Sequence, residues 1–355
     1  MSRPAPSTVP LIVDVDTGID DSLALLYLLA SPEAEILAIA STGGNVPVAQ
    51  VAANNLAWLD LCGRTDIEVT VGSPTPLRIP LRTTEDTHGP QGIGYAELPH
   101  SSRGPSDRSS ARTWVEIARQ RPGAVTGLVT GPLTNLALAL RLEPELPHLL
   151  KRLVVMGGVF NHPGNTTPTC EWNIFVDPEA AQEVFAAFSV VPADRRPLIC
   201  PLDVTETIEM RPEHLRLLAQ VAGSEPAELI TEQDPPGTRS RTSNPIVRHL
   251  SDAVRFYLEF HRDHGQGFLA HMHDPFAAAL ALDPGLAVTR PATVDVELEG
   301  TLTRGTTVAD WTGMWGREPN ADIAVGTDPA AFFVHLIERV GGFAARARFA
   351  SPETR

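Results

Sequence analysis

The chain has 355 residues, a formal net charge of −15 and a hydrophobic fraction of 43%. This length suits one large α/β domain or two small ones, with enough apolar residues for a substantial core. The acidic balance argues against a nucleic-acid partner, because phosphate backbones bind basic surfaces, and no apolar run reaches the about 18 residues of a membrane span.

Short apolar runs alternate with helical patterns along the chain. They predict strands at residues 11–15, 36–40, 67–71, 124–129, 153–156 and 197–200, and helices between them at 20–30, 48–61, 133–140 and 178–188. The C-terminal third adds predicted helices at 246–264, 275–282 and 329–340 and strands at 293–298, 306–310 and 322–325. This alternation predicts an α/β fold with an open, mostly parallel central sheet and helices on both faces.

No shift in composition marks a domain boundary, so we expect a single domain over residues 1–355 with its core at about 11–340. Two stretches interrupt the pattern, at residues 72–110 and 231–244, and both are rich in loop-forming residues. Long loops in a compact α/β domain are often lids. Disordered surface loops would explain their composition equally well.

Several common catalytic devices are missing from the sequence. The single lysine, Lys151, is followed by Arg152, so a phosphate-binding G-K-[ST] loop is impossible. Cys62, Cys170 and Cys200 are widely spaced, which suits free thiols in a reducing compartment. The N-terminal residues lack the apolar segment of a secretion signal, so we expect a cytoplasmic protein.

Four aspartates surround the end of the first predicted strand: Asp14, Asp16, Asp20 and Asp21. Strand alternation places Asp14 and Asp16 on one face of the strand's carboxyl end, and Gly18 permits a sharp turn into the next helix. Ligand sites in open α/β sheets lie at such ends. Carboxylates gathered there repel one another unless a cation is bound, so the cluster predicts a cation site.

A helix cap is the alternative explanation for Asp20 or Asp21, but it leaves two aspartates on a buried strand unexplained. Oxygen ligands without a nearby cysteine favour Ca²⁺ or Mg²⁺ over Zn²⁺. The spacing does not fit an EF-hand, which needs a glutamate where Leu25 stands. The phosphatase pattern D-x-D-x-[TV] also fails, because its fifth position is Gly18.

Residues 14–21 resemble the N-terminal signature D-x-D-x-G-x-D-D of the nucleoside hydrolase family. Further segments similar to the family follow in order at residues 43–45, 130–135, 156–158, 164–173, 177–180, 273–275, 304–308 and 316–320. The resemblance covers about residues 11–340. It implies a Rossmann-like nucleoside hydrolase fold and hydrolysis of the N-glycosidic bond of ribonucleosides to ribose and a free base, as in purine or pyrimidine salvage.

The resemblance also implies a Ca²⁺ cofactor bound by Asp16, Asp21 and Asp274 and by the backbone carbonyl of Thr130. Asp16 is the implied general base that activates water for attack on the sugar. The implied transition state is oxocarbenium-like, with positive charge growing on the ring. His273 is the implied general acid, which protonates the departing base.

The implied substrate-binding residues are mostly carboxylates and amides, which suit the hydroxyl groups of ribose and stabilise positive charge on its ring. They are Asp20, Asn45, Asn165, Glu171 and Asn173, of which Asn173 is also an implied catalytic residue. His88 and Trp172 are candidates for contacts with the base. Gln91 stands where the family usually has an acid, so the base preference is left open.

Several alternatives remain at this point. An inactive ribose- or nucleoside-binding protein would keep the same cluster, and a related ribosyl compound such as nicotinamide riboside could be the substrate. A phosphatase is disfavoured because no basic phosphate clamp accompanies the aspartates. We expect His261 and His264 to be surface residues. The resemblance suggests a homodimer or homotetramer acting on a small-molecule nucleoside, without nucleic-acid or membrane partners.

Overall fold

The computed structural model describes residues 8–347, and its core is a mixed sheet of nine strands in the order β10-β9-β11-β6-β5-β4-β1-β2-β3. Seven neighbouring strands, β3, β2, β1, β4, β5, β6 and β11, pair in parallel. Strands β9 and β10 complete the sheet by antiparallel pairing. The predicted open, mostly parallel sheet is therefore confirmed. The strand bounds are β1 Val9–Val15, β2 Ala34–Ser41, β3 Glu68–Val71, β4 Thr126–Val129, β5 Arg152–Met156, β6 Leu198–Cys200, β9 Ala287–Val296, β10 Thr307–Asp310 and β11 Ala321–Thr327.

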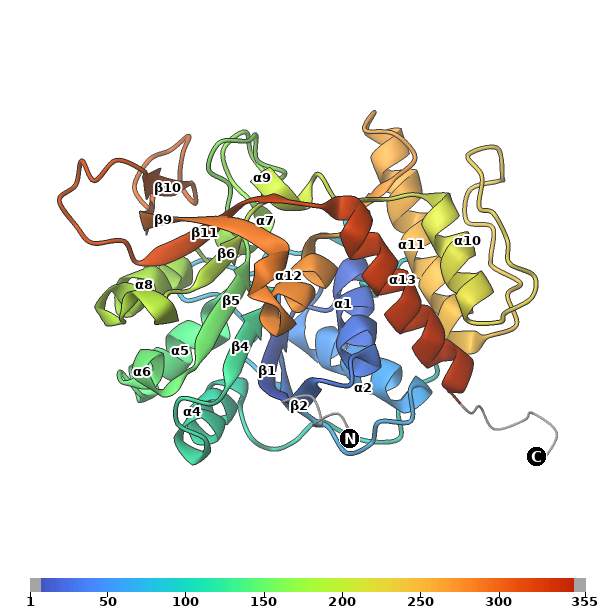
Figure 1. Cartoon of the computed structure of the whole chain (residues 1–355), viewed down its shortest axis with the longest axis horizontal. Coiled ribbons are helices and arrows are strands. Elements are labelled where there is room, and N and C mark those ends of the chain that lie inside the picture. Colours follow the sequence, from blue (N-terminus) through green and yellow to red (C-terminus); the bar gives the residue numbers. More distant parts are fainter. Residues whose placement is uncertain (1–7, 348–355) are drawn as a thin grey trace, which may run out of the picture.

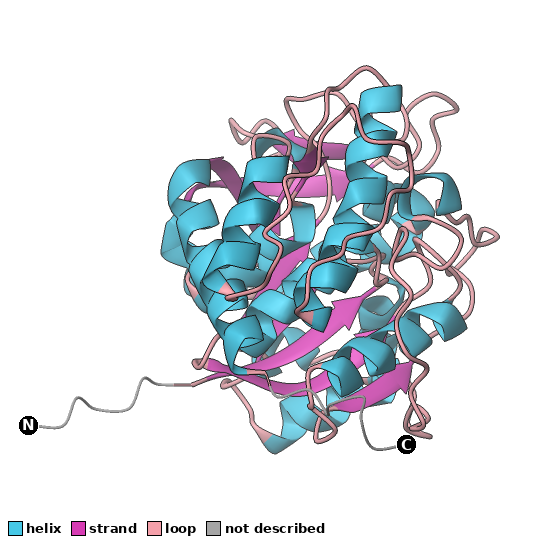
Figure 2. Cartoon of the chain, turned by 90° about the vertical axis from the view of Figure 1, so that its right-hand side faces the viewer, coloured by secondary structure: helices cyan, strands magenta, loops and turns pink. Residues whose placement is uncertain are grey.

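Helices cover both faces of the sheet, and two separate hydrophobic clusters form the core (Figures 1 and 2). On one face, α1 (Ile19–Ala30), α2 (Val48–Leu61) and α12 (His273–Leu282) pack against the sheet. Helices α10 (Pro212–Val221), α11 (Pro245–Asp263) and α13 (Pro329–Arg346) extend the same hydrophobic cluster by packing on other helices. The other face packs against α4 (Ser110–Gln120), α5 (Thr134–Leu142) and α8 (Pro178–Ala187). The helices on both faces explain why the central strands are almost wholly apolar.

The order of the strands reverses between β1 and β4, which lie side by side in the sheet (Figure 1). From β1 the chain moves through β2 to β3 in one direction, and from β4 through β5 to β6 in the other. The connections after β1 and β4 therefore separate to opposite faces and leave a crevice at the carboxyl edge. Asp16 follows β1 and Thr130 follows β4 at this point.

Short elements complete the described part of the chain. They are the two-stranded sheet of β7 (Glu209–Met210) and β8 (Ala270–His271), the helices α3 (Glu85–His88), α6 (Leu146–Leu149), α7 (Trp172–Val176) and α9 (Leu202–Thr205), and 3₁₀ turns at Phe188–Val190, Ala193–Arg195 and Pro284–Leu286. Within residues 8–347, no helix combines the length and apolar character needed to cross a membrane.

The sequence pattern misses parts of this architecture. Helices α4 and α10 were not predicted, and β9 begins at Ala287 rather than at residue 293. Pro291 hides the start of β9, because proline is depleted in strands. It is tolerated there since β10 pairs with β9 only from Thr293 onward.

Candidate active site

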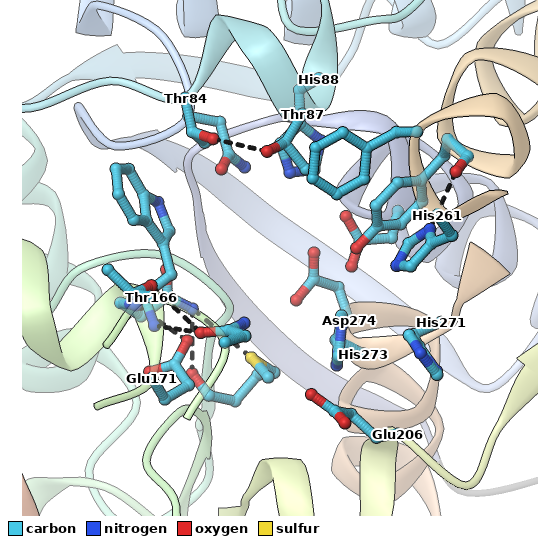
Figure 3. A pocket seen from close by; sticks show the side chains of 18 of the residues that line it. Thr84, Thr87, His88, Thr166, Glu171, Glu206, His261, His271, His273 and Asp274 are labelled. Carbon is cyan, nitrogen blue, oxygen red and sulfur yellow. Dashed lines mark hydrogen bonds between the residues drawn. The ribbon is translucent and has the colours of Figure 1, made fainter. Parts of the chain in front are cut away.

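A cavity of about 710 Å³ lies at the carboxyl edge of the sheet, where the strand order reverses. Carboxylates and amides from the loops after β1, β2 and β5 line one part of it, and aromatic and histidine rings from α11, β8 and α12 line another. Figure 3 shows Glu171 on one side and His271, His273 and Glu206 on the other. Among the described residues, no lysine or arginine lines this cavity.

Asp14 and Asp16 are two residues apart but have different surroundings. The carboxylate of Asp14 accepts hydrogen bonds from Trp114 Nε1 at 2.7 Å and from Asn135 Nδ2 at 3.0 Å, and it does not line the cavity. Asp16 lines the cavity, and its Oδ2 accepts a hydrogen bond from the backbone N–H of Asn45 at 2.9 Å. Its Oδ1 is buried and has no partner among the described residues. A buried carboxylate oxygen in this state needs a ligand or water.

Asp16, Asp20, Asp21 and Asp274 form a buried group that we call the carboxylate cluster. One carboxylate oxygen from each of Asp20, Asp21 and Asp274 lies within 4.8 Å of the others. Packing of α1 against α12 brings these residues together over a long stretch of sequence. Thr130 donates a hydrogen bond from its hydroxyl to Asp21 at 2.7 Å, which ties the cluster to the end of β4.

Burial raises the pKa of every carboxyl group in the cluster, and the neighbouring carboxylates raise the pKa values of Asp16, Asp20 and Asp274 further. For Asp20 the pKa rises to about 7. Four acidic groups in one buried place are stable at neutral pH only if protons or a cation offset their charge. The unpartnered Oδ1 of Asp16 and the oxygen-only donor set fit a hard divalent cation.

The predicted cation ligands lie at one place, with one difference in detail. Asp16, Asp21 and Asp274 are neighbours, and the closest group of three carboxylates contains Asp20 in place of Asp16. The carbonyl oxygen of Thr130 accepts a hydrogen bond from Asn173 Nδ2 at 2.8 Å. The site therefore offers Asp20 as a further carboxylate beside the set expected from the sequence.

Glycines allow the backbone to approach the cluster closely. A Cβ at Gly44 would lie 2.1 Å from Asp16 Oδ2, and a Cβ at Gly18 would lie 2.6 Å from both Asn45 Nδ2 and His88 Nδ1. A side chain at either position would force these site residues to move. Glycine at these two positions therefore leaves Asp16, Asn45 and His88 in place.

Glu171 and Asn173 are held rigidly on the polar side of the cavity. Glu171 caps α7 and accepts hydrogen bonds from the backbone N–H groups of Asn173 at 2.8 Å and Gly158 at 3.0 Å. Asn173 donates to the carbonyl of Thr130, so its side-chain oxygen is left for another partner.

Asn165 accepts a hydrogen bond from the backbone N–H of Trp172 at 3.0 Å. All these predicted substrate-binding residues line the cavity, as do Asp20, Asn45, His88 and Trp172.

Tyr257, His261, His271 and His273 form a continuous ring-rich surface that we call the histidine wall. The ring centroids of His261 and His271 are 4.9 Å apart, and those of His271 and His273 are 5.7 Å apart. Burial lowers the pKa values of His261 and His271 to about 4, and burial and the neighbouring histidines lower that of His273 well below its usual range. These three rings are therefore neutral at pH 7.

The expectation that His261 is a surface residue was wrong, since it is 4% exposed and lines the cavity. His261 lies on the inner face of the amphipathic helix α11, one turn after Tyr257. His264 is exposed, as expected, but it also borders the cavity. Tyr257, Glu206 and His271 also line the cavity and were not predicted from the sequence, because no local motif surrounds them.

The two long loops are ordered and meet at α11. The hydroxyl of Tyr95, in the first loop, donates to Glu259 Oε2 at 2.7 Å. The backbone N–H of Gly237, in the second loop, donates to Glu259 Oε1 at 3.1 Å. Arg255 pairs with the same carboxylate, its Nε lying 2.9 Å from Oε1. These contacts fasten both loops to the helix that carries Tyr257 and His261.

Comparison with known proteins identifies relatives over nearly the whole chain. A family model described as inosine-uridine preferring nucleoside hydrolase matches residues 11–334. The pyrimidine-specific ribonucleoside hydrolase RihA of Citrobacter koseri is 36% identical over 338 residues, which is 95% of this chain and 99% of the relative.

Two solved structures extend the comparison. A purine-preferring ribonucleoside hydrolase from Gardnerella vaginalis superposes with a TM-score of 0.81 and 30% identity, covering 95% of this chain and 99% of its own. A plant nucleoside hydrolase, the PpNRh1 enzyme, gives a TM-score of 0.82 and 28% identity, with 95% and 99% coverage.

Proposed function

Because this chain belongs to the family of inosine-uridine preferring nucleoside hydrolases and is a nucleoside N-ribohydrolase, we propose that it cleaves ribonucleosides with Ca²⁺ held by the carboxylate cluster. The observation that carries the proposal is the convergence of Asp16, Asp20, Asp21 and Asp274 at one buried point that faces the cavity. Asp16, Asp21, Asp274 and the carbonyl of Thr130 are the proposed ligands. Asp20 stands close enough to join them or to bind a sugar hydroxyl.

A bound Ca²⁺ would supply the positive charge that eases deprotonation of water and would attract the sugar's neighbouring hydroxyls. Asp16 is the group that takes the proton from the attacking water. The water oxygen bonds to C1′ of the ribose as the bond from C1′ to the base breaks. The electron pair of that bond leaves with the base.

The amide and carboxylate groups opposite the histidine wall act on the sugar. Positive charge grows on the ring as the bond to the base breaks, and the oxygens of Glu171 and Asn173 stabilise it. These groups are already oriented by backbone hydrogen bonds, so little reorganisation is needed during the reaction. His88, Trp172 and the histidine wall are the proposed surroundings of the base.

His273 is the proposed donor to the departing base. Because its pKa is lowered well below the usual range by burial and neighbouring histidines, the ring acts as a neutral N–H donor rather than as an imidazolium. Such a donor stabilises the negative charge that the base acquires as the bond breaks. The base leaves with the electron pair and takes a proton from solvent, and Asp16 returns the proton of the attacking water to solvent, so that the protons balance.

Pyrimidine ribonucleosides are the proposed preferred substrates. The support is the 36% identity to RihA proteins whose name specifies pyrimidines, against 30% identity to the purine-preferring neighbour. The protein is further proposed to act in the cytoplasm as a homodimer or homotetramer. Its free thiols, at Cys62, Cys170 and Cys200, suit a reducing compartment.

Turnover of a nucleoside panel tests the proposal. Cytidine, uridine, inosine, guanosine and nicotinamide riboside are incubated with the protein and Ca²⁺, and release of base is followed by chromatography. We expect cleavage of the pyrimidine ribonucleosides and its loss in Asp16→Ala. Binding without cleavage of any compound would support an inactive nucleoside-binding protein, and cleavage of nicotinamide riboside alone would support a related ribosyl substrate.

A further inference from the structure

Thr205 lies directly behind the histidine wall. It ends helix α9, which follows β6 at the same edge of the sheet as the cavity. Its side chain is fully buried, and its hydroxyl oxygen lies 2.7 Å from Nδ1 of His273, 68 residues further along the chain. Thr205 is not among the described residues that line the cavity, so it can influence a substrate there only through His273.

The direction of this hydrogen bond follows because the buried hydroxyl proton of Thr205 must have an acceptor. A buried hydroxyl proton requires an acceptor, and within residues 8–347 the only hydrogen-bond partner of the Thr205 hydroxyl is the His273 ring. If Nδ1 carried the ring proton and donated it, the hydroxyl proton would have no acceptor, at a cost of about 1–3 kcal/mol. The hydroxyl therefore donates, and Nδ1 accepts with its lone pair.

We propose that Thr205 is a positioning residue that keeps the single ring proton of His273 on Nε2, the nitrogen available to the departing base. The inference rests on the proposed function, because it assigns Thr205 a part in the same reaction. His273 lines the cavity, and its Nε2 has no protein partner in the part of the chain that the structure describes. With the opposite tautomer, Nε2 would present a lone pair to a base that is gaining electrons.

Two other rings that line the cavity, those of His261 and His88, obtain their tautomers from backbone groups. His261 Nδ1 lies 2.8 Å from the carbonyl of Tyr257, which can only accept, so Nδ1 carries the proton and Nε2 the lone pair. His88 Nδ1 accepts from the backbone N–H of Ile19 at 3.1 Å, so its proton lies on Nε2. His273 instead depends on a side-chain hydroxyl, which a substitution can remove without altering the backbone.

The first test compares two substrates whose leaving groups differ in their need for a donor. Thr205→Val keeps the shape of the side chain and removes the hydroxyl, and Thr205→Ser restores it. For pyrimidine ribonucleosides we expect kcat in Thr205→Val to fall roughly 10–100-fold with little change in KM, a loss of the size found when a metal-bound histidine loses its orienting partner. For p-nitrophenyl β-D-ribofuranoside, whose leaving group is stable as an anion, we expect a change of less than about threefold.

The second test reads the tautomer directly and needs no turnover. Long-range proton–nitrogen spectra of the histidine rings distinguish a protonated from an unprotonated nitrogen, and comparison with His273→Gln assigns the signals. In the wild-type protein, His273 should show an unprotonated Nδ1 and a protonated Nε2. In Thr205→Val these two signals should shift toward a mixture of tautomers, and in Thr205→Ser they should return to the wild-type positions.

The outcomes separate this inference from the proposed function. A wild-type protein that cleaves no nucleoside contradicts the function, while the ring spectra still decide the role of Thr205. A protonated Nδ1 in the wild type, or spectra that do not change in Thr205→Val, overturns the inference. Equal losses on both substrates in Thr205→Val, without rescue by serine, would show a structural role and also overturn it.

Discussion

The carboxylate cluster and the histidine wall face the same cavity but are built in different ways. Three of the four cluster residues lie within six positions of one another, at the turn from β1 into α1. The four residues of the wall come from α11, β8 and the first turn of α12. The cluster is thus a local feature of the chain, whereas the wall exists only after distant elements have packed together.

The two regions also differ in electrostatics. The cluster concentrates acidic groups whose pKa values are all raised by burial, so it favours a cation. The wall presents neutral rings, since burial lowers the pKa values of its histidines. This division fits the proposal that the cluster acts in bond cleavage and that the wall surrounds the base. Each region should therefore respond differently to substitution.

The largest expected effect is that of Asp16→Asn. Loss of the proposed general base and of one proposed cation ligand should lower kcat/KM about 10³-fold, within the range for removing such a base. The loss should be equal for cytidine, uridine and inosine, because Asp16 acts on the sugar side. Steady-state kinetics with these three nucleosides measure it. A loss confined to one base would contradict the assignment of the cluster to bond cleavage.

Asp14→Asn is the matched control, because Asp14 lies two residues away and does not line the cavity. The carboxamide would turn an N–H toward either Trp114 or Asn135, both of which donate to Asp14. We expect a loss of about 1–3 kcal/mol in the free energy of unfolding. Activity of the folded protein at 25 °C should stay within about tenfold of wild type. Thermal denaturation and kinetics together separate this structural role from that of Asp16.

A smaller and selective effect is expected for His261→Phe on the histidine wall. The change keeps a ring but removes the Nε2 acceptor. Losing one hydrogen bond to the base should change the transition-state free energy by about 1–1.5 kcal/mol, or roughly tenfold in rate. The ratio of kcat/KM for cytidine over uridine should change by this factor, while p-nitrophenyl riboside cleavage stays nearly constant. Unchanged ratios across all bases would show that His261 does not contact the base.

The smallest effect is expected where the two long loops join. Tyr95→Phe removes the hydrogen bond to Glu259 that fastens the first loop to α11. We expect a loss of about 1 kcal/mol in stability and a rise in KM of less than about threefold, without a change in base preference. Melting temperature and Michaelis constants measure both effects. A large fall in kcat would instead make the loop contact part of the reaction.

Much of the fold could be predicted from the sequence, because buried parallel strands are short apolar runs between helical patterns. The carboxyl-edge location of the site also followed from Asp14 and Asp16 at the end of the first strand. The sequence did not show that Asp16 lines the cavity while Asp14 is hydrogen-bonded away from it. Trp114 and Asn135, which satisfy Asp14, lie 100 and 121 residues away.

The histidine wall was only partly predictable. His273 was found because it stands beside Asp274 in a family-like segment, but His261 was misplaced to the surface. On helix α11 the period of the sequence indicates a buried face, without showing whether that face meets the core or a cavity. Thr205 carried no signal at all, since its importance comes from a contact across 68 residues.

Turnover by metal-stripped protein as Ca²⁺ is added back tests the central claim most directly. The protein is treated with chelator, loss of metal is verified by elemental analysis, and release of base from cytidine and uridine is then followed at increasing Ca²⁺. We predict no release without the ion and a saturable return to the full rate, with no return in Asp16→Asn. Full-rate cleavage by the verified metal-free protein would contradict a carboxylate cluster that works through a divalent cation.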